Sequence, residues 1–240
     1  MKTFVSSELL ASYGAVNAVS LRISDMPMLY SMRRTGRIGG PEESNRKKFF
    51  KDIGFEESAA ARVGQIHSDH FVFVEKSGNY PNADALVTTR KGLPLAISIA
   101  DCVPVFLFDR RNLTIAAVHA GWRGTSSSIA GKTLEFMIGR GGCRPEDLLA
   151  YIGPSAGQCC YEVGEEVAAN FDSSFLKPGN AAGKSMLDLK SANAVQLTAR
   201  GIPSGNIDVN QSCTICNLEF HSFRREGNAS GRMIAAIGIR

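Results

Sequence analysis

Uninterrupted apolar runs dominate the middle of the chain. The segment LPLAISIADCVPVFLFD, residues 93–109, contains two runs rich in Ile, Val and Phe that are separated by a polar break at residues 100–102. A third run, LTIAAVHA at residues 113–120, follows after a short polar turn. Runs of this length and composition, bounded by turn residues, are typical of buried strands. The pattern therefore predicts three consecutive strands with polar groups at their ends.

Helical patterns follow and alternate with further strands. The stretch IAGKTLEFMIGR comes after several Ser and Thr residues suited to capping and stops at a Gly pair, so it predicts a helix at residues 129–140. A second helix is predicted at residues 188–200, before a Gly and a Pro. Strands are predicted in LLAYIGPSAG and RMIAAIGI, and a short helix in VGEEVAANF. This alternation predicts an α/β fold, with residues 1–240 forming a single domain whose mixed sheet is covered by helices.

Composition narrows the classes of partner. Apolar residues make up 44% of the 240 residues and charged residues 21%, which is typical of a folded globular protein. The net charge of +4 is small and the basic residues are scattered, which argues against nucleic acid as a partner. No apolar run reaches the roughly 18 residues of a membrane span. Glu8 interrupts the apolar stretch that a secretory signal needs, so we expect a cytoplasmic protein that binds no membrane.

Six cysteines are distributed along the chain, and in a cytoplasmic protein we expect reduced thiols. Cys143 and the adjacent Cys159 and Cys160 are interpreted as packing residues. Cys213 and Cys216 form one C-x-x-C motif without a second such pair. A structural use of this motif is therefore favoured over a zinc ribbon or a redox site.

Three candidate metal ligands stand at strand ends or at polar breaks beside strands. Cys102 lies in the break between two predicted strands, His119 lies near the end of the third, and His67 lies in the polar segment QIHSDHF. Two imidazoles and one thiolate suit catalytic Zn²⁺, because a fourth position stays open for water. The same residue types also suit a metal-free pair in which Cys102 is the nucleophile and His119 is its base. Residue types alone do not decide between these two hypotheses.

Charged and aromatic residues near these positions supply further candidates. Asp101 and Asp69 are candidates to orient a ligand or to move a proton, with turn capping as the alternative. The glycine-rich HAGWRGTSSS offers Arg123 and the start of a helix to an anion. Within it, Trp122 suits either stacking on a base or filling the sheet edge. In FHSFRREG, Arg224 and Arg225 stand beside phenylalanines, which suits a phosphate, ribose or base contact, with a solvated surface pair as the alternative.

Several motifs together resemble a known family. They are QIHSDHF, ADALVTT, ISIADCVPVFLFD, AAVHAGWRGT, YIGPSAGQCCYEVGEEV, DLKSANAVQL and CTICNLEFHSFRREG, followed by GRMIAAIGI. From about Asn45 to the C-terminus the chain is similar to the YfiH-like family, long labelled multi-copper polyphenol oxidoreductases or laccase-domain proteins. The pair of motifs ADCVP and HAGWRGT makes this resemblance highly specific.

The resemblance implies an α/β domain similar to the catalytic domain of cytotoxic necrotizing factor toxins. It implies that His67, Cys102 and His119 are ligands of Zn²⁺, with Cu²⁺ as the alternative, and that Gln65 of the Q-x-H motif contacts substrate. It also implies phosphorolysis of adenosine, inosine, guanosine and methylthioadenosine, with an added adenosine deaminase activity. A multicopper oxidase needs several copper centres, for which the four histidines of this chain are too few.

The leading hypothesis is that phosphate attacks the anomeric carbon of a purine nucleoside held at the metal site. Arg123 with the helix start, and Arg224, are expected to bind the anion, and Asp101 is expected to assist proton movement. The alternatives are a cysteine hydrolase, with a role in editing peptidoglycan precursors, and a non-enzymatic binding module. The segment 1–44 departs from the family pattern, and SMRRTGRIGG at 31–40 matches it only loosely, so no substrate contact is assigned to it. The chain is expected to be a monomer or a homodimer.

Overall fold

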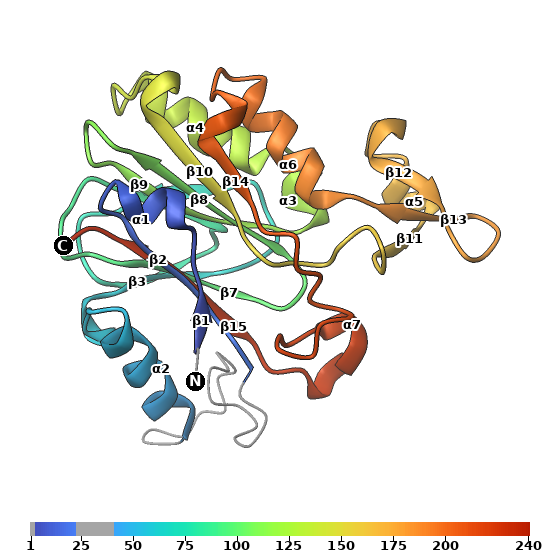
Figure 1. The fold of residues 1–240 in the computed structure, drawn as a ribbon, viewed down its shortest axis with the longest axis horizontal. Coiled ribbons are helices and arrows are strands. Elements are labelled where there is room, and N and C mark those ends of the chain that lie inside the picture. The colour runs from blue at the N-terminus through green and yellow to red at the C-terminus, as the bar shows by residue number, and fades with distance from the viewer. Residues whose placement is uncertain (1–2, 23–40) are drawn as a thin grey trace.

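Two stacked β-sheets form the centre of the molecule, and helices lie on both outer sides (Figure 1). The computed structural model describes residues 3–22 and 41–240. In spatial order, the first sheet consists of β1 (Phe4–Val5), β2 (Val16–Ser20), β15 (Met233–Gly238), β7 (Leu95–Ile99), β3 (Ala61–Gly64) and β5 (Gly78–Pro81). The second consists of β14 (Ile207–Val209), β10 (Leu148–Ile152), β8 (Val103–Asp109), β9 (Ile115–Ala120), β6 (Ala85–Thr88) and β4 (Phe71–Phe73). Both sheets are mixed, because each contains parallel and antiparallel pairs.

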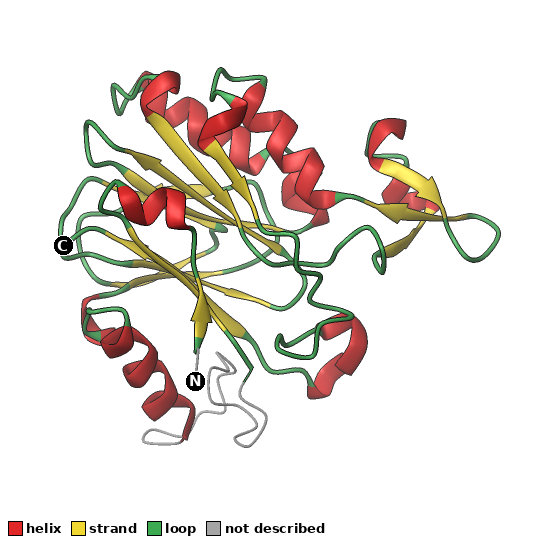
Figure 2. Cartoon of the chain, in the orientation of Figure 1, coloured by secondary structure: helices red, strands yellow, loops and turns green. Residues whose placement is uncertain are grey.

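Helices cover the outer face of each large sheet (Figure 2). On the second sheet these are α3 (Trp122–Ser126), α4 (Ile129–Gly139) and α6 (Leu189–Thr198), and on the first it is α2 (Pro41–Asp52). The other helices are α1 (Glu8–Ser12), α5 (Glu165–Ala168) and α7 (Phe223–Glu226), with 3₁₀ turns at Glu57–Ala59, Pro145–Asp147, Ser173–Phe175, Ser204–Asn206 and Gly227–Ala229. A small sheet of β11 (Glu162–Gly164), β13 (Lys184–Leu187) and β12 (Leu176–Pro178) extends from one end. Within the described ranges, no helix is both long and apolar enough to cross a lipid bilayer.

The alternation of side chains along each strand connects the layers. In β8, Val105 and Leu107 pack beneath the helices, whereas Phe106 and Phe108 pack between the two sheets. In β15, alternate residues likewise divide between the space between the sheets and the core beneath α2. Because both faces of these strands are buried, their sequences read as continuous apolar runs.

The predicted α/β class with mixed sheets and covering helices is confirmed. The strands predicted within 93–109 and 113–120 and the helices predicted at 129–140 and 188–200 are present, with slightly different ends. The sequence predicts one mixed sheet, whereas the structure contains two large ones. The sequence does not distinguish these cases, because a buried strand has the same apolar pattern whether helices or a second sheet cover it. The expected turn in HAGWRGTSSS contains α3. The segment 31–40 lies outside the described residues.

The helical layer above the second sheet generates a test of the core. Leu134 of α4 is fully buried against strands of that sheet. We expect Leu134→Ala to lower the free energy of unfolding by about 2–5 kcal/mol, since it leaves a cavity that the packed layer cannot close. Val195 of α6 is 50% exposed, and Val195→Ala is expected to change the free energy of unfolding by less than about 0.5 kcal/mol. Urea unfolding followed by circular dichroism measures both, and equal effects of the two changes contradict this layer assignment.

Candidate metal centre and active site

The three predicted ligands meet where strands of both large sheets end. His67 follows β3, Cys102 lies between β7 and β8, and His119 lies near the end of β9. Their donor atoms all lie within 4.8 Å of one another. The Cys102 Sγ is 3.9 Å from the Nε2 of His67, and the two imidazole rings stand edge to face with their centroids 4.9 Å apart. The structure thus brings together the nitrogen and sulfur donors that a three-ligand metal site requires.

The backbone around the ligands adopts conformations that non-glycine residues rarely take. His67 has φ +60° and Asp101, next to Cys102, has φ +83°, both in the left-handed region. At Gly121, a Cβ atom would lie 3.1 Å from both the Sγ of Cys102 and the Cδ2 of His67. Glycine at this position therefore lets the strand end approach the ligands closely. Strain of this kind is typical of sites where the surrounding structure fixes functional groups.

A buried aspartate, Asp84, connects two of the three ligands. Its carboxylate accepts hydrogen bonds from the backbone amides of Ile66, His67 and Ser68. It also lies 2.8 Å from the Nδ1 of His119, whose ring N–H donates to it. Because Nδ1 is occupied in this way, Nε2 of His119 is the nitrogen left to bind a metal. Burial opposes ionisation of Asp84, but these donors outweigh it and hold the pKa of its carboxyl well below the usual range.

Cys102 and His119 form a charged pair. Burial disfavours the Cys102 thiolate, but the charges of His119 and His67 and their hydrogen bonds outweigh this effect and lower the pKa of Cys102 to about 6. Burial likewise disfavours the His119 imidazolium, yet Cys102 and Asp84 raise the pKa of His119 to about 9. At a pH between these two pKa values, Cys102 is a thiolate and His119 is an imidazolium. A thiolate is the form that both a metal ligand and a nucleophile need.

A cavity of about 500 Å³ opens over the three ligands, a size suited to a small molecule. Its lining combines aromatic rings with two guanidinium groups and a few polar groups. The lining residues are Gln65, His67, Ser98, Ala100, Asp101, Cys102, His119, Trp122, Tyr161, Phe223, Arg224 and Arg232. The arrangement offers flat apolar surfaces and positive charge beside the converging donors.

Asp101 holds one wall of this cavity in place. One carboxylate oxygen accepts from the hydroxyl of Thr214 at 2.6 Å. The other accepts from the hydroxyl of Ser222 at 3.0 Å and from the backbone amide of Arg224 at 2.7 Å. These bonds satisfy a buried charge and fix the start of α7 beside the ligands.

Of the other predicted residues, Gln65 and Arg224 line the cavity, whereas Arg123 and Asp69 do not. Gln65 lines the cavity, and its side-chain amide bonds to the backbone of Ser98 at 2.7 and 2.8 Å. Arg224 also lines the cavity; its guanidinium donates to a backbone carbonyl at 2.7 Å and lies 5.0 Å from the centre of the Tyr161 ring. Arg123 is exposed and stacks on Trp122, and it is not among the described residues that line the cavity. Asp69 forms an ion pair with a surface lysine.

Asp84, Tyr161 and Arg232 are functional candidates at the site that the sequence pattern does not predict. Asp84 stands in the quoted motif ADALVTT, where a carboxylate directly before an apolar strand is a signal of a buried and partnered charge. Tyr161 reads like any core aromatic, and burial raises the pKa of its phenol to about 12. Arg232 carries no local signal, because it reaches the cavity from the start of the last strand.

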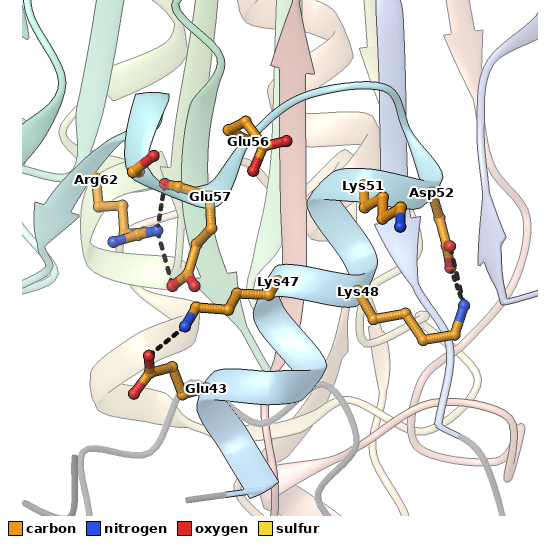
Figure 3. A pocket seen from close by; sticks show the side chains of 9 residues that line it. Glu43, Lys47, Lys48, Lys51, Asp52, Glu56, Glu57 and Arg62 are labelled. Carbon is orange, nitrogen blue, oxygen red and sulfur yellow. Dashed lines mark hydrogen bonds and ion pairs between the residues drawn. The ribbon is translucent and has the colours of Figure 1, made fainter. Parts of the chain in front are cut away.

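A larger hollow of about 810 Å³ lies elsewhere, along α2 (Figure 3). Six of its charged side chains pair with one another: Lys47 with Glu43, Lys48 with Asp52, and Arg62 with Glu57. No ligand-type cluster of His or Cys lies there among the described residues. We therefore assign the functional site to the smaller cavity.

Comparisons with known proteins identify relatives of the chain as a whole. The family model described as multi-copper polyphenol oxidoreductase laccase matches residues 42–240. A purine nucleoside phosphorylase of Deinococcus radiodurans is 38% identical over 201 residues, 83% of this chain and 78% of that protein. Adenosine deaminase RL5, from an unknown prokaryotic organism, is 38% identical over 170 residues, 68% of this chain and 64% of that protein.

A solved structure extends the likeness to the whole fold. The crystal structure of the hypothetical protein YfiH of Bacillus licheniformis matches with a TM-score of 0.91 at 27% identity, covering 100% of this chain and 97% of that one. The relatives that are named as enzymes support an enzyme here as well. The chain belongs to the YfiH-like family, whose model is described as multi-copper polyphenol oxidoreductase laccase.

Proposed function

We propose that the chain is a zinc-dependent purine nucleoside phosphorylase that also deaminates adenosine. The observation that supports this most is the convergence of two imidazoles and one thiolate within 4.8 Å, beneath a cavity that contains aromatic and guanidinium groups. The names of relatives as purine nucleoside phosphorylase and adenosine deaminase agree with the proposal. Copper is the alternative metal for the same donors.

The ligands and Asp84 set up the metal position in the proposed mechanism. When bound, Zn²⁺ supplies Lewis acidity beside the substrate and activates water for the deamination. Asp84 keeps the proton on the Nδ1 of His119, so that Nε2 points to the metal position. The same carboxylate fixes the backbone of His67. Both ligands are therefore oriented before any metal binds.

The cavity wall binds the nucleoside and the anion in the proposed reaction. We assign the purine to the aromatic surface of Trp122, Tyr161 and Phe223, and the phosphate to Arg224 and Arg232. A phosphate oxygen forms a bond to the anomeric carbon while the bond from that carbon to the purine nitrogen breaks. The electron pair leaves with the purine, which then gains a proton, and the sugar becomes ribose 1-phosphate.

Asp101 and Gln65 act in this proposal by positioning. Asp101, which was expected to assist proton movement, accepts three hydrogen bonds and holds Arg224 over the cavity. Gln65 keeps β3 and β7 together at the cavity floor through Ser98. Arg123 is exposed on α3, so we assign the phosphate to the two arginines that line the cavity instead.

The four histidines of the chain are too few for laccase chemistry. Only His67 and His119 belong to the metal centre. His70 lies beside Asp69 on the surface, and His221 lies against Glu226. Oxidation of phenols by oxygen in a laccase needs several copper centres, each with its own histidines.

A cysteine hydrolase is the second candidate, and the charged pair of Cys102 and His119 favours it. A thiolate beside an imidazolium is the resting state of many cysteine nucleophiles. In that case Cys102 attacks an acyl carbon and His119 protonates the leaving group, so no metal is needed. The following experiments separate the two candidates.

Replacement of Cys102 tests which role its sulfur has. Cys102→Asp keeps a zinc ligand but no sulfur nucleophile, so we expect reduced, zinc-dependent phosphorolysis of inosine, whereas Cys102→Ala loses it. Hypoxanthine and ribose 1-phosphate are measured with zinc-loaded protein and phosphate. A Cys102→Asp variant that binds zinc fully yet forms no product, together with an acyl adduct trapped on wild-type Cys102, contradicts the metal role.

Asp84→Asn tests the orientation of the ligands. The amide retains the shape but replaces the carboxylate that accepts from His119, so we expect zinc affinity or activity to fall about 10–100-fold. Affinity is measured by competition with a chromogenic chelator, and circular dichroism checks the fold. Asp69→Asn, which alters only the surface contacts of Asp69 with Lys132 and His70, is the matched control and should leave zinc affinity and activity unchanged. Unaltered zinc affinity in Asp84→Asn would refute the orienting role.

The pH dependence of alkylation tests the charged pair. In metal-free protein the thiolate of Cys102 reacts with iodoacetamide, so its rate should rise with pH through about 6 and then level off. In His119→Ala the midpoint should move to higher pH, because the imidazolium that stabilises the thiolate is gone. Mass spectrometry of the Cys102 peptide gives the rates. A wild-type midpoint near the ordinary thiol value of about 8.5 contradicts the pair.

A further inference from the structure

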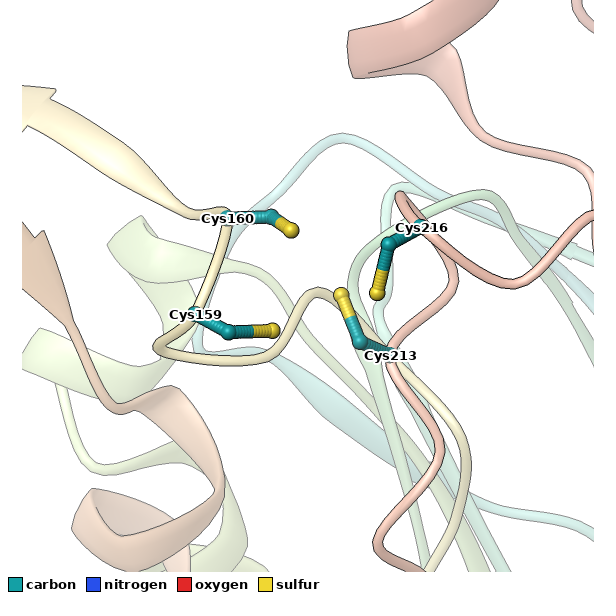
Figure 4. Close-up of side chains that lie close together, drawn as sticks. All are labelled: Cys159, Cys160, Cys213 and Cys216. Atoms are coloured by element: carbon teal, nitrogen blue, oxygen red, sulfur yellow. The ribbon is translucent and has the colours of Figure 1, made fainter.

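Four cysteines outside the active site converge on one point (Figure 4). Cys159 and Cys160 lie in the segment between β10 and β11, and Cys213 and Cys216 lie between β14 and α7. Their four sulfur atoms all lie within 4.8 Å of one another. The C-x-x-C motif has no second such pair in the sequence, but in the folded protein it lies beside the adjacent cysteines Cys159 and Cys160. Cys159 is exposed and Cys160 half-buried, so the interpretation of these two as packing residues is corrected.

The spacing of the sulfur atoms suits a tetrahedral metal ion. With zinc–sulfur bonds of about 2.3 Å, the corners of a tetrahedron lie about 3.8 Å apart. A contraction of at most about 1 Å from the observed spacing reaches this geometry. All six cysteines of the chain are free thiols in the structure. A disulfide brings only two sulfur atoms together, whereas here each of the four lies near all the others.

The surrounding backbone is arranged for a charged sulfur cluster. The amide of Gly157 donates to the Sγ of Cys213 at 3.2 Å, and the backbone amides of Ile215 and Cys216 also favour negative charge on this sulfur. A Cβ atom at Gly157 would lie 3.0 to 3.4 Å from atoms of Cys213 and Cys159, so a larger residue there would have to push the cluster apart by a few tenths of an ångström. Backbone amides that point at one atom in this way form a site for negative charge.

A buried cation lies beside the cluster. The ammonium of Lys190 donates to the carbonyls of Asn210 and Ser212, at 2.7 and 2.8 Å, directly before Cys213. It interacts electrostatically with Cys213 and two other cysteines of the cluster. Four thiolates around one divalent cation carry a net charge of −2, which Lys190 partly offsets.

We propose that Cys159, Cys160, Cys213 and Cys216 bind one Zn²⁺ in a closed, structural site that is separate from the His67–Cys102–His119 centre. Four sulfur ligands leave no open position, so this zinc takes no part in the reaction. It links two segments that are distant in sequence. Cys160 precedes Tyr161 of the cavity wall, and Thr214, which donates to Asp101, lies between the other two ligands. The bound zinc therefore fixes two parts of the active-site wall.

Metal counting on matched variants tests the proposal. Wild-type protein should bind two zinc ions per chain, and Cys102→Ala and the double variant Cys213→Ser/Cys216→Ser should each bind one. Cys143→Ala, which removes a cysteine outside both clusters, should bind two. The double variant should also lose thermal stability, because its wall segments are no longer linked. One zinc per wild-type chain, lost entirely in Cys102→Ala, overturns the proposal.

X-ray absorption on zinc-loaded Cys102→Ala gives a second test that does not require the double variant to fold. The expected spectrum contains only sulfur neighbours, at about 2.3 Å. Nitrogen neighbours, iron with labile sulfide, or disulfides between these cysteines in freshly purified protein each overturn the proposal. The count of two in wild-type protein includes the zinc of the proposed function, but the spectrum of Cys102→Ala does not depend on that function, because this variant lacks one ligand of the other centre and the spectrum does not measure turnover.

Discussion

The geometry of the candidate site depends on the hydrogen bonds that the buried carboxylate of Asp84 accepts. A charge without access to water needs hydrogen-bond donors as partners. The carboxylate of Asp84 has two sets of them, the amides of residues 66–68 and the imidazole of His119. These donors belong to the loop after β3 and to β9, which lie in different sheets. One residue therefore joins the two sheets at the point where their ligands meet. It also helps to hold His67 in a left-handed conformation that a free chain disfavours.

Asp101 repeats this principle on the other side of the cavity. Its carboxylate gathers Thr214, Ser222 and the amide of Arg224, all from the segment between β14 and β15. The cysteine cluster lies in the same segment and in the segment that carries Tyr161. One wall of the cavity is thus fixed from two sides, by a buried carboxylate and, in our proposal, by a second zinc ion.

The charged pair of Cys102 and His119 accounts for two competing interpretations of this site. In the metal-free protein a thiolate beside an imidazolium resembles the resting state of a cysteine nucleophile. A metal ion needs the same thiolate but a neutral imidazole, so its binding displaces the proton of His119. The proximity of His67, which a Cys/His nucleophile pair does not require, favours the metal.

The local sequence pattern was enough to predict the strands around Cys102 and His119 and the helices α4 and α6. The spacing of apolar residues and the capping residues that determine such elements extend over only a few positions. The resemblance of motifs indicated the three residues that the structure brings together, which are His67, Cys102 and His119. The number of sheets, the partner of His119 and the position of Arg123 outside the cavity could not be predicted. Each of them depends on which faces pack together.

The sequence by itself determined which elements form and which residue types are available for chemistry, since both are local properties of the chain. Only the tertiary structure decided which of these residues meet. Asp84 reaches His119, and Cys159 and Cys160 reach Cys213 and Cys216, across separations of 35 to more than 50 positions. Such contacts arise from the stacking and order of strands, and stacking is set by the burial of whole faces rather than by any short motif.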